Sequence, residues 1–333
     1  MSVDVSRFDD DRETWDRYVN QSPQGSIFHR YDVIEIFENL SGGEFHLLIG
    51  HKGQEPVGLF PVLELRKLGM SMTFSPPPRM GIPYQGPIHL NVTKLKQRKR
   101  ERRMEQFVEG CLEWCERELE PRYTHVRTQT RYEDPRPFMW NEFSTNPRYT
   151  YHLDISRDPD EVKTSFSKSL RRYLDPDENR FEIELQGADG IRFVHQQMTA
   201  RYNEQGLNYV VPLDLLLDLY SNLPEDAVRP YICLVDGERE GGIVVLRDSD
   251  TVYFQEGGGA PDVDYPINDL LHWRIIEDAH DVGLSRYDLA GANDPRLCSY
   301  KSKFNPELTQ YFTFEKGTPL MNMAVSAYKK IRM

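Results

Sequence analysis

The sequence contains no long apolar run, and its first residues do not resemble an export signal. No uninterrupted apolar stretch approaches the roughly 18 residues that a membrane-spanning helix needs. The first ten residues are acidic and lack the apolar centre of a signal peptide. We therefore expect a cytoplasmic protein without a transmembrane segment.

Cysteine is scarce, and its spacing gives no support to a metal site. The four cysteines form no CxxC pair and no cluster with the nine scattered histidines. Cys111 and Cys115 lie one helical turn apart, which is typical of apolar packing inside a helix. We expect neither a structural zinc nor a catalytic metal.

Several catalytic signatures are also missing. The chain has no P-loop, HExxH, Gly-x-Ser-x-Gly or Rossmann fingerprint, so nucleotide hydrolysis, zinc proteolysis and serine hydrolysis lack support. The net charge of -12 repels nucleic acid in general, and we expect no DNA partner.

The sequence does contain an internal repeat in the order of its predicted elements, and its length suits two domains. Segment 51–58 turns a hairpin between the apolar runs 45–49 and 59–65, and Val235–Gly242 does the same in the second half, with Asp236-Gly237 as a strong turn signal. Each hairpin is followed by a Gly/Pro loop (76–87; 257–266), a long amphipathic helix (94–119; 267–282) and a strand (123–128; 286–289).

This repeated order predicts two α+β domains of one architecture, each a mixed twisted sheet flanked by helices. We expect them at 1–150 and 151–333, and the last helix, about 317–333, could pack on the first domain. Further helices are predicted at 158–174, 187–205, 211–223 and 318–333, the first of them capped by Asp158. Chance recurrence of so common an order is the alternative.

The candidate reaction site lies in Tyr287–Phe304. This segment reads as a strand that ends at Gly291, a loop, and a short helix that presents Lys301 and Lys303. A lysine just past a strand end and a glycine turn suits an anion or a developing oxyanion, and we choose Lys301 for that role. Asp288 could orient or deprotonate an amine, or it could be an ordinary turn aspartate.

A glycine-rich segment, Gln255–Ala260, closes an earlier strand. Its adjacent glycines could let backbone N–H groups cradle a phosphate, with Gln255, Gly258 and Gly259 as the candidate contacts, or they could form a flexible turn or bulge. Asn268 is placed to cap the helix that follows and is a further candidate for the donor site.

Two basic segments offer anion contacts. Arg171 and Arg172 end a predicted helix, where cations are favourable in themselves, and they could instead bind a substrate phosphate. Lys94–Arg103 carries seven cations and one anion without interleaved aromatic residues. It reads as a solvated helix start, with tRNA or a phosphorylated substrate as the alternative.

The order of several short motifs resembles the Fem-type aminoacyltransferases, a branch of the GNAT acyltransferase superfamily. The likeness runs over most of the chain and rests on Trp15, Ser26-Ile-Phe-His29, Gly58-Leu-Phe-Pro61, Gly86-Pro87, Leu153-Asp-Ile, Phe166-Ser-Lys-Ser-Leu-Arg171, Asn268-Asp-Leu-Leu-His-Trp, Asp288-Leu-Ala-Gly291 and Tyr300-Lys-Ser-Lys-Phe304.

This resemblance implies tandem GNAT domains, with the transfer site in the second. Lys301 matches the functional lysine of the Fem Phe-Lys-x-x-Phe pattern, with Tyr300 in place of the first Phe, and Tyr300 is a candidate substrate contact. Gln255–Ala260 formally fits the GNAT signature for the pyrophosphate of coenzyme A.

The predicted function is N-acyl transfer, most simply of acetyl, from acyl-CoA to a primary amine of a small-molecule or cell-envelope-related substrate. The chain lacks the helical arm of the murein-bridge enzymes, so aminoacyl-tRNA is the alternative donor and is not favoured. A non-catalytic, degenerate GNAT pair is a third reading.

Overall fold

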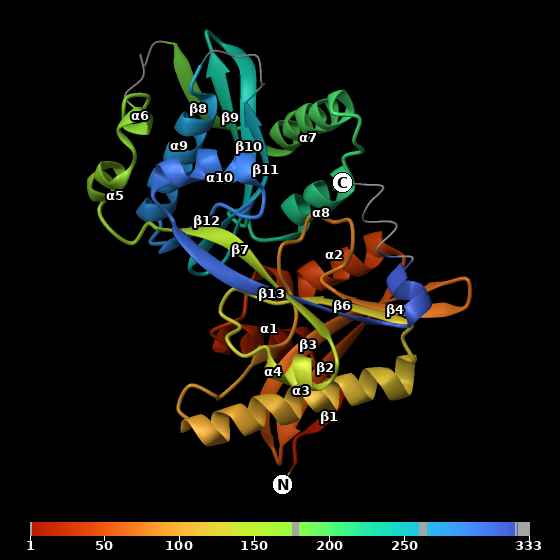
Figure 1. Ribbon diagram of the computed structural model, residues 1–333. Coiled ribbons are helices and arrows are strands. Elements are labelled where there is room, and N and C mark those ends of the chain that lie inside the picture. The colour runs from red at the N-terminus through yellow and green to blue at the C-terminus, as the bar shows by residue number, and fades with distance from the viewer. Residues whose placement is uncertain (1, 175–179, 260–264, 324, 326–333) are drawn as a thin grey trace. The chain divides into compact units, whose positions relative to one another are not determined.

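The computed structural model describes residues 2–174, 180–259, 265–323 and 325, and the chain divides into two compact units. The first unit consists of Met1–Arg148 with Gln310–Met333, and the second of Tyr149–Thr309 (Figure 1). The domains expected from the sequence instead assign the segment after residue 309 to the second half.

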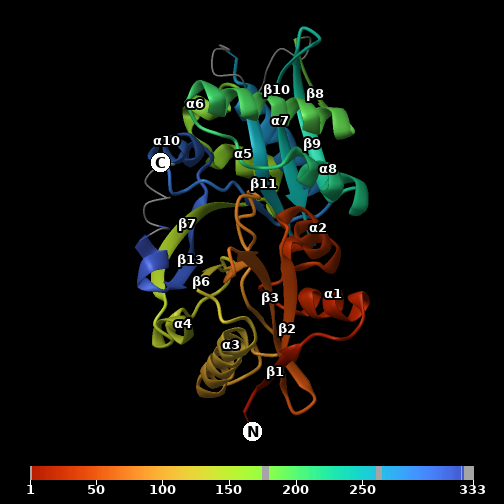
Figure 2. The same cartoon turned by 90° about the vertical axis from the view of Figure 1, so that its right-hand side faces the viewer.

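The first unit is a mixed sheet between helices. Its elements are β1 (Asp4–Arg7), α1 (Arg12–Gln21), η1 (Ile27–His29), α2 (Tyr31–Ser41), β2 (Glu44–Lys52), β3 (Glu55–Lys67), β4 (Met70–Ser75), β5 (Ile88–His89), α3 (Gln97–Leu119), β6 (Tyr123–Arg127) and α4 (Arg136–Trp140). Strands β1 to β4 pair antiparallel in order, and β6 joins β4 in parallel. Helices α1 and α2 cover one face and α3 the other (Figure 2).

The second unit repeats this plan. Its elements are α5 (Pro159–Ser165), α6 (Lys168–Arg171), β8 (Phe181–Leu185), α7 (Gly187–Glu204), α8 (Leu213–Asn222), β9 (Val228–Val235), β10 (Glu238–Arg247), β11 (Thr251–Gly259), α9 (Ile267–Asp281), β12 (Arg286–Asp288), α10 (Pro295–Lys301) and η2 (Ser302–Phe304). Strands β8 to β11 pair antiparallel in order, and β12 joins β11 in parallel. Helices α7 and α9 lie on opposite faces of these strands (Figure 1).

The two repeats exchange their last strands. Strand β7 (Ser144–Asp154) follows the first repeat in sequence but pairs with β12, and β13 (Glu307–Gly317) follows the second repeat but pairs with β6. From β1 and from β8 onward, the main elements of the two units follow one order of strand, two helices, three strands, helix, strand and helix. A strand from the other repeat completes each unit, and α5 and α6 are additions in the second unit and β5 in the first. The predicted α+β fold, with mixed strands flanked by helices in each unit, is confirmed.

Each unit has its own apolar core. In the first, Phe138 and Phe314 stack at 4.1 Å between ring centroids, and Phe107 and Trp114 of α3 pack on the same cluster. In the second, α9 packs its apolar face on β9–β12. Within the part of the chain described, no helix is long and apolar enough to cross a membrane.

Two local predictions differ in outcome. Asp236 and Gly237 have φ values of 52° and 85°, as a two-residue hairpin turn of the predicted kind requires. The single helix predicted at 158–174 is wrong, because the chain is extended at Phe166 and restarts with Ser167 as the cap of α6. The break buries Phe166 against Trp273 and Phe304.

Of the predicted closing helix, residues 319–323 are helical, and most of the rest lies outside the described residues.

Candidate active site

The predicted site begins where β11 and β12 part. Their parallel pairing covers three residue pairs and ends at Tyr253 and Asp288. Strand β12 stops there and the chain turns through Ala290 and Gly291, whereas β11 continues to Gly259 with β10 as its partner. Among the described residues, no strand pairs with this edge of β11 from Phe254 onward, so its backbone groups there are not used in the ladder.

A β-bulge sits at the start of this edge. Val244 of β10 pairs with Glu256 and Val245 pairs with Phe254, so Gln255 is the extra residue. Both amide atoms of Gln255 are buried and, among the described residues, lack a hydrogen-bond partner. Bulges redirect side chains at functional sites, and an unsatisfied amide is a ready contact for a polar ligand.

Lys301 is buried at the end of β12, with only 5% of its surface exposed. Its ammonium donates to the carbonyl oxygens of Leu289 and Ala290 and lies 4.7 Å from the centre of the Phe254 ring. Burial lowers the pKa of Lys301 to about 8, and the Asp288 charge opposes that shift. The lysine therefore stays largely protonated at neutral pH and keeps one N–H free of these two carbonyls.

The turn that holds Lys301 requires glycine at its tightest point. Gly291 has a φ of +70°, and a Cβ built on it would lie 2.9 Å from Lys301 Nζ and 3.0 Å from Leu297 Cδ1. A side chain here would be strained by its backbone and would also press on the ammonium. The glycine turn read from the sequence thus determines how closely the lysine approaches the strand end.

Asp288 is close to this lysine, and one of its carboxylate oxygens, Oδ1, is engaged, whereas the buried Oδ2 makes no hydrogen bond among the described residues. Its Oδ1 accepts hydrogen bonds from Thr150 Oγ1 (2.5 Å) and the Ala290 N–H (2.8 Å), and its Oδ2 lies 3.4 Å from His152 Nε2. Burial raises the pKa of Asp288, but His152, Thr150 and the Ala290 N–H outweigh it and hold the pKa below its usual value. These contacts favour a role in orienting the loop over a role as base.

At the end of β11, side chains hold the backbone of Gly259 by hydrogen bonds, apart from the Lys301 turn. Asn268 Oδ1 accepts the Gly259 N–H at 2.7 Å, and Arg201 donates to the Gly259 carbonyl oxygen. The expected N-cap role of Asn268 is wrong: the helix begins at Ile267, so Asn268 lies in its first turn and reaches back to β11. Gly258 pairs with Gly242 in the ladder, and most of the loop after Gly259 lies outside the described residues.

Of the remaining predicted residues, Tyr300 lies inside the second unit, and Arg171 and Arg172 lie on its surface. Tyr300 donates its hydroxyl to Asp269 Oδ1 at 2.8 Å, so this phenol is held inside the second unit. Arg171 and Arg172 are exposed and line a recess of about 520 Å³ together with Lys163 and Lys168. Four cations around one recess suit an anionic group.

Sequence reasoning missed a buried carboxyl on the bulged strand. Glu256 has 2% of its surface exposed, accepts a hydrogen bond from Tyr209 through Oε2, and keeps Oε1 buried with no partner among the described residues. Burial raises the pKa of Glu256 to about 8. The sequence gives little sign of this role. Glu256 adjoins the glycines in sequence, but its burial and its contact with Tyr209 arise only in the folded unit.

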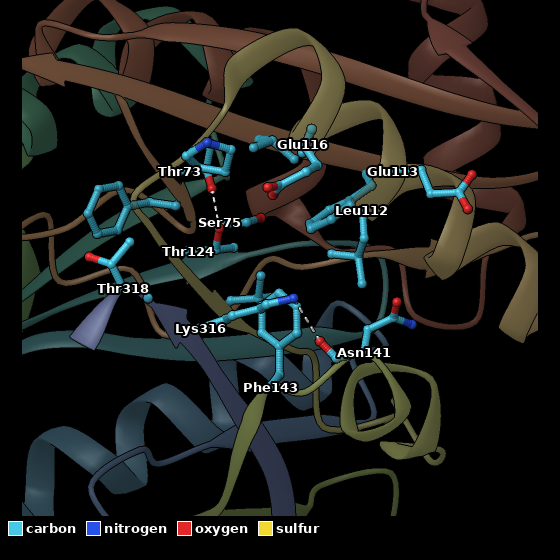
Figure 3. A pocket seen from close by; sticks show the side chains of 17 residues that line it. Thr73, Ser75, Leu112, Glu113, Glu116, Thr124, Asn141, Phe143, Lys316 and Thr318 are labelled. Carbon is cyan, nitrogen blue, oxygen red and sulfur yellow. Dashed lines mark hydrogen bonds between the residues drawn. The ribbon is translucent and has the colours of Figure 1, made fainter. Parts of the chain in front are cut away.

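A second cavity, of about 440 Å³, lies in the first unit between α3, β4, β6 and β13 (Figure 3). It is lined by apolar side chains such as Leu112 and Phe143, with a Thr73–Thr124 hydroxyl pair at 2.8 Å and Lys316 bonded to the Asn141 carbonyl. All residues predicted for the site belong to the second unit, so this cavity is not part of it.

Comparison with known families now gives the class of the fold. Residues 161–302 match the family model described as an acetyltransferase (GNAT) domain. The match begins within α5, runs to the end of α10 and includes every residue predicted for the site. No curated protein sequence matches the chain.

Solved structures extend the likeness to nearly the whole chain. The structure of FemX aligns with a TM-score of 0.73 at 12% identity, and the alignment covers 96% of this chain and 99% of the FemX chain. The C-terminal DUF2156 domain of an Agrobacterium fabrum protein assigned as a lysylphosphatidylglycerol synthetase has a TM-score of 0.57 at 11% identity, with 93% of both chains covered. A tandem GNAT protein from the clavulanic acid biosynthesis pathway has a TM-score of 0.53 at 10% identity, and the alignment covers 95% of this chain and 99% of that protein.

These findings confirm the predicted resemblance to the Fem-type branch of the GNAT superfamily. At such low identity the structures establish a shared fold alone. The chain therefore has the GNAT acyltransferase fold, arranged as a tandem repeat with exchanged strands.

Proposed function

We propose that the protein is an N-acyltransferase that moves an acyl group, acetyl in the simplest case, from acyl-CoA to a primary amine of a small or envelope-related substrate in the cytoplasm. The observation that carries this proposal is the buried, carbonyl-anchored Lys301 at the point where β12 leaves the edge of β11. A fixed cation beside an open strand edge suits a reaction that develops an oxyanion.

The donor would lie along the open edge of β11. The pantetheine arm of coenzyme A is an extended chain with two amides, which hydrogen-bond to an exposed strand as an added strand would. Gln255 at the bulge offers a buried amide with no partner among the described residues. Gly258 and Gly259 keep the strand free of side chains near the donor phosphates, and Asn268 and Arg201 hold this backbone in place.

The chemistry needs one proton acceptor and one oxyanion donor. The neutral amine attacks the thioester carbonyl, a C–N bond forms, and the C–S bond then breaks to release the thiolate of coenzyme A, which takes up a proton. Lys301 would donate its remaining N–H to the oxyanion. Glu256, whose pKa is about 8, would accept the proton that the amine loses in those molecules in which it is ionised, a fraction that grows as the pH rises towards 8. Asp288 would orient the loop around Lys301.

The recess lined by Arg171 and Arg172 would receive an anionic part of the acceptor. Lys163 and Lys168 add to its positive charge, and Asp160 supplies the one acidic side chain in its lining. Tyr300 would act indirectly, because its hydroxyl is engaged by Asp269.

Thermal unfolding with different donors tests the proposal. Acetyl-CoA or a longer acyl-CoA at a hundred times its Kd should stabilise the protein by about 2.7 kcal/mol. Stabilisation by aminoacyl-tRNA but by no acyl-CoA would contradict the proposed donor. Mass spectrometry of amines incubated with the protein and acyl-CoA would then detect the acylated product.

An aminoacyl-tRNA donor is the second candidate, and one observation favours it. The start of α3 carries cations that are largely exposed, whereas Arg103 is buried and paired with Glu55 at 2.8 Å. Replacing Arg98, Lys99 and Arg102 by Gln should abolish activity if tRNA is the donor and leave acyl-CoA activity intact. A Gln replacement of Lys52 and Lys67 serves as a control for loss of surface charge.

The remaining reading is a non-catalytic GNAT pair that binds a ligand. It predicts that a Lys301→Ala protein retains full function in cells, which both enzyme readings exclude.

A further inference from the structure

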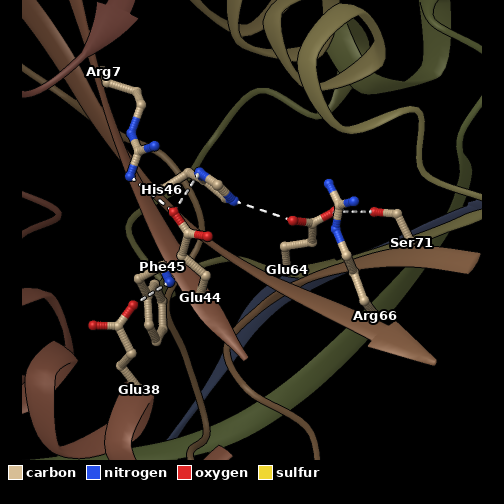
Figure 4. Close-up of polar contacts among 8 residues, drawn as sticks. All are labelled: Arg7, Glu38, Glu44, Phe45, His46, Glu64, Arg66 and Ser71. Carbon is tan, nitrogen blue, oxygen red and sulfur yellow. Dashed lines mark hydrogen bonds and ion pairs between the residues drawn. The ribbon is translucent and has the colours of Figure 1, made fainter. Parts of the chain in front are cut away.

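A cluster of three metal-binding side chains lies on the first unit, apart from every residue used above. Glu44 and Glu64 are directly opposite each other in the β2–β3 ladder, and His46 lies two residues along β2 on the same face. One ligand atom from each of the three lies within 4.8 Å of the others. Figure 4 shows the imidazole of His46 between the two carboxylates.

His46 is a buried polar group that makes no side-chain hydrogen bond within the described residues. Only 4% of its surface is exposed, and within the described part of the chain neither ring nitrogen makes a hydrogen bond. Its Nε2 lies 3.5 Å from Glu64 Oε2 and its Nδ1 lies 3.9 Å from Glu44 Oε1. A buried, unsatisfied imidazole aimed at carboxylates costs stability unless something binds it.

The geometry around His46 favours a cation in this position. Nε2 faces Glu64 and Nδ1 faces Glu44, so a ring nitrogen that carries no proton has a carboxylate opposite it and is repelled unless a cation lies between them. Two glutamates directly opposite each other in a sheet also repel, which a cation relieves.

The surroundings hold Glu64 in a metal-binding orientation. Ser71 Oγ donates to Glu64 Oε1 at 2.6 Å and Arg66 Nε donates to the same oxygen at 2.9 Å, so Oε2 is the oxygen directed at His46. Such outer partners orient the ligands of metal sites. Arg7 contacts Glu44 Oε1 at 3.2 Å, but this pair is about half exposed and therefore weak.

We propose that Glu44, His46 and Glu64 form a binding site for a divalent transition-metal ion, Zn²⁺ or Mn²⁺. One imidazole and two carboxylates suit these ions better than they suit Mg²⁺ or Ca²⁺, which prefer oxygen alone. Ligand atoms around a tetrahedral zinc lie roughly 3.4 Å apart, close to the His46–Glu64 separation. Glu44 is exposed and completes the set by rotating its side chain, which leaves the fourth position open to solvent.

The test titrates chelator-treated protein with Zn²⁺, Mn²⁺ and Mg²⁺ and follows the Tm, with Co²⁺ absorption as a direct readout of an imidazole–carboxylate site. We expect one equivalent of Zn²⁺ or Mn²⁺ to bind and to raise the Tm by about 4 °C or more at a hundredfold excess over Kd, with a smaller effect of Mg²⁺. H46Q and E44Q should weaken binding at least tenfold. E44Q alters an exposed residue, so its folding is secure.

H125Q is the matched control, because His125 also faces a carboxylate, that of Glu315 at 3.9 Å, in the same unit. H125Q should bind the metal as the wild type does. Equal binding by wild type and H46Q would place the metal elsewhere and overturn the proposal. No metal binding by the wild type would also overturn it.

Discussion

At the scale of single residues, two buried groups have pKa values that converge near 8 from opposite directions. Burial lowers the pKa of Lys301 and raises that of Glu256, because in both cases it disfavours the charged form. The lysine is largely cationic and the glutamate largely protonated at pH 7. Such groups are candidates for acid–base and electrostatic roles because both states are accessible near neutral pH.

Replacement of Lys301 by Ala should lower kcat by about 10²–10³-fold if its ammonium stabilises the oxyanion. The KM for acyl-CoA should change far less, because the proposed contact exists mainly in the transition state. Lys303, two residues away and over the Tyr300 ring, provides the control. Steady-state kinetics in which K301A and K303A behave alike would remove Lys301 from the reaction.

Replacement of Glu256 by Gln should change how stability depends on pH. The folded pKa is about 8 and the unfolded pKa about 4.5, so the folded state binds the extra proton between these values. The free energy of unfolding of the wild type should therefore fall as pH rises from 5 to 8, by up to roughly 4 kcal/mol from this residue. In E256Q this part of the pH dependence of the free energy of unfolding should disappear.

Denaturant unfolding at pH 5, 6.5 and 8 measures this effect. E204Q, on the exposed end of α7, is the control and should follow the wild type. If E256Q also follows the wild type at all three pH values, Glu256 does not hold its proton in the folded state.

At the scale of elements, glycine allows the strands beside the site to approach closely. Gly257 has a φ of +129°, and a Cβ there would lie 2.2 Å from the Gly242 carbonyl oxygen. Gly241 and Gly259 face each other in the same ladder, where a Cβ on Gly241 would lie 2.8 Å from the Gly259 Cα. The glycine run is thus part of the sheet itself, which a reading as a flexible loop overlooks.

G257A should therefore destabilise the second unit by about 2–4 kcal/mol, since both its φ and its contact are unfavourable. G283A tests the effect of φ alone, because Gly283 has a φ of +80° with nothing within 4 Å of its Cβ position, and it should cost about 1 kcal/mol. Chemical denaturation compares the two variants. Equal losses would show that the close approach of β10 and β11 contributes little.

At the scale of the whole molecule, the exchange of β7 and β13 makes each unit depend on both repeats. Phe314 of β13 is fully buried in the core of the first unit, although it follows the second repeat in sequence. Phe304, ten residues earlier, is fully buried in the core of the second unit. The boundary between the units therefore falls inside strands, where sequence patterns give no sign of a linker.

F314A and F304A should each cost about 3–5 kcal/mol but loosen different strands. Hydrogen exchange should lose protection at β6 in F314A and at β12 in F304A. Protection lost first at β12 in F314A would contradict the strand exchange.

Local signals account for what the sequence predicted correctly. The Asp236-Gly237 turn, the helical periodicity of 267–282 and the glycine turn at Gly291 depend on neighbours within a few residues, and they are recovered within a residue or two. The order of these elements also predicted the repeat, because both copies use the same local devices.

Contacts between distant residues account for what it missed. The break at Phe166 depends on burial against Trp273 and Phe304, and Asn268 bonds Gly259 instead of capping its own helix. Cysteine–histidine spacing gives no sign of the Glu44–His46–Glu64 cluster, because Glu64 reaches the other two residues only through strand register.

By itself the sequence determined the α+β class, the repeated order of elements and the place of Lys301 after a glycine turn. These follow from propensities, turn chemistry and periodicity, which act over short stretches of chain. Only the tertiary structure decided which strands complete each unit, that Lys301 and Glu256 are buried, and that Oδ1 of Asp288 is engaged by Thr150 and the Ala290 N–H. Burial and long-range pairing set those properties, because a charge is shifted by the atoms that surround it in space.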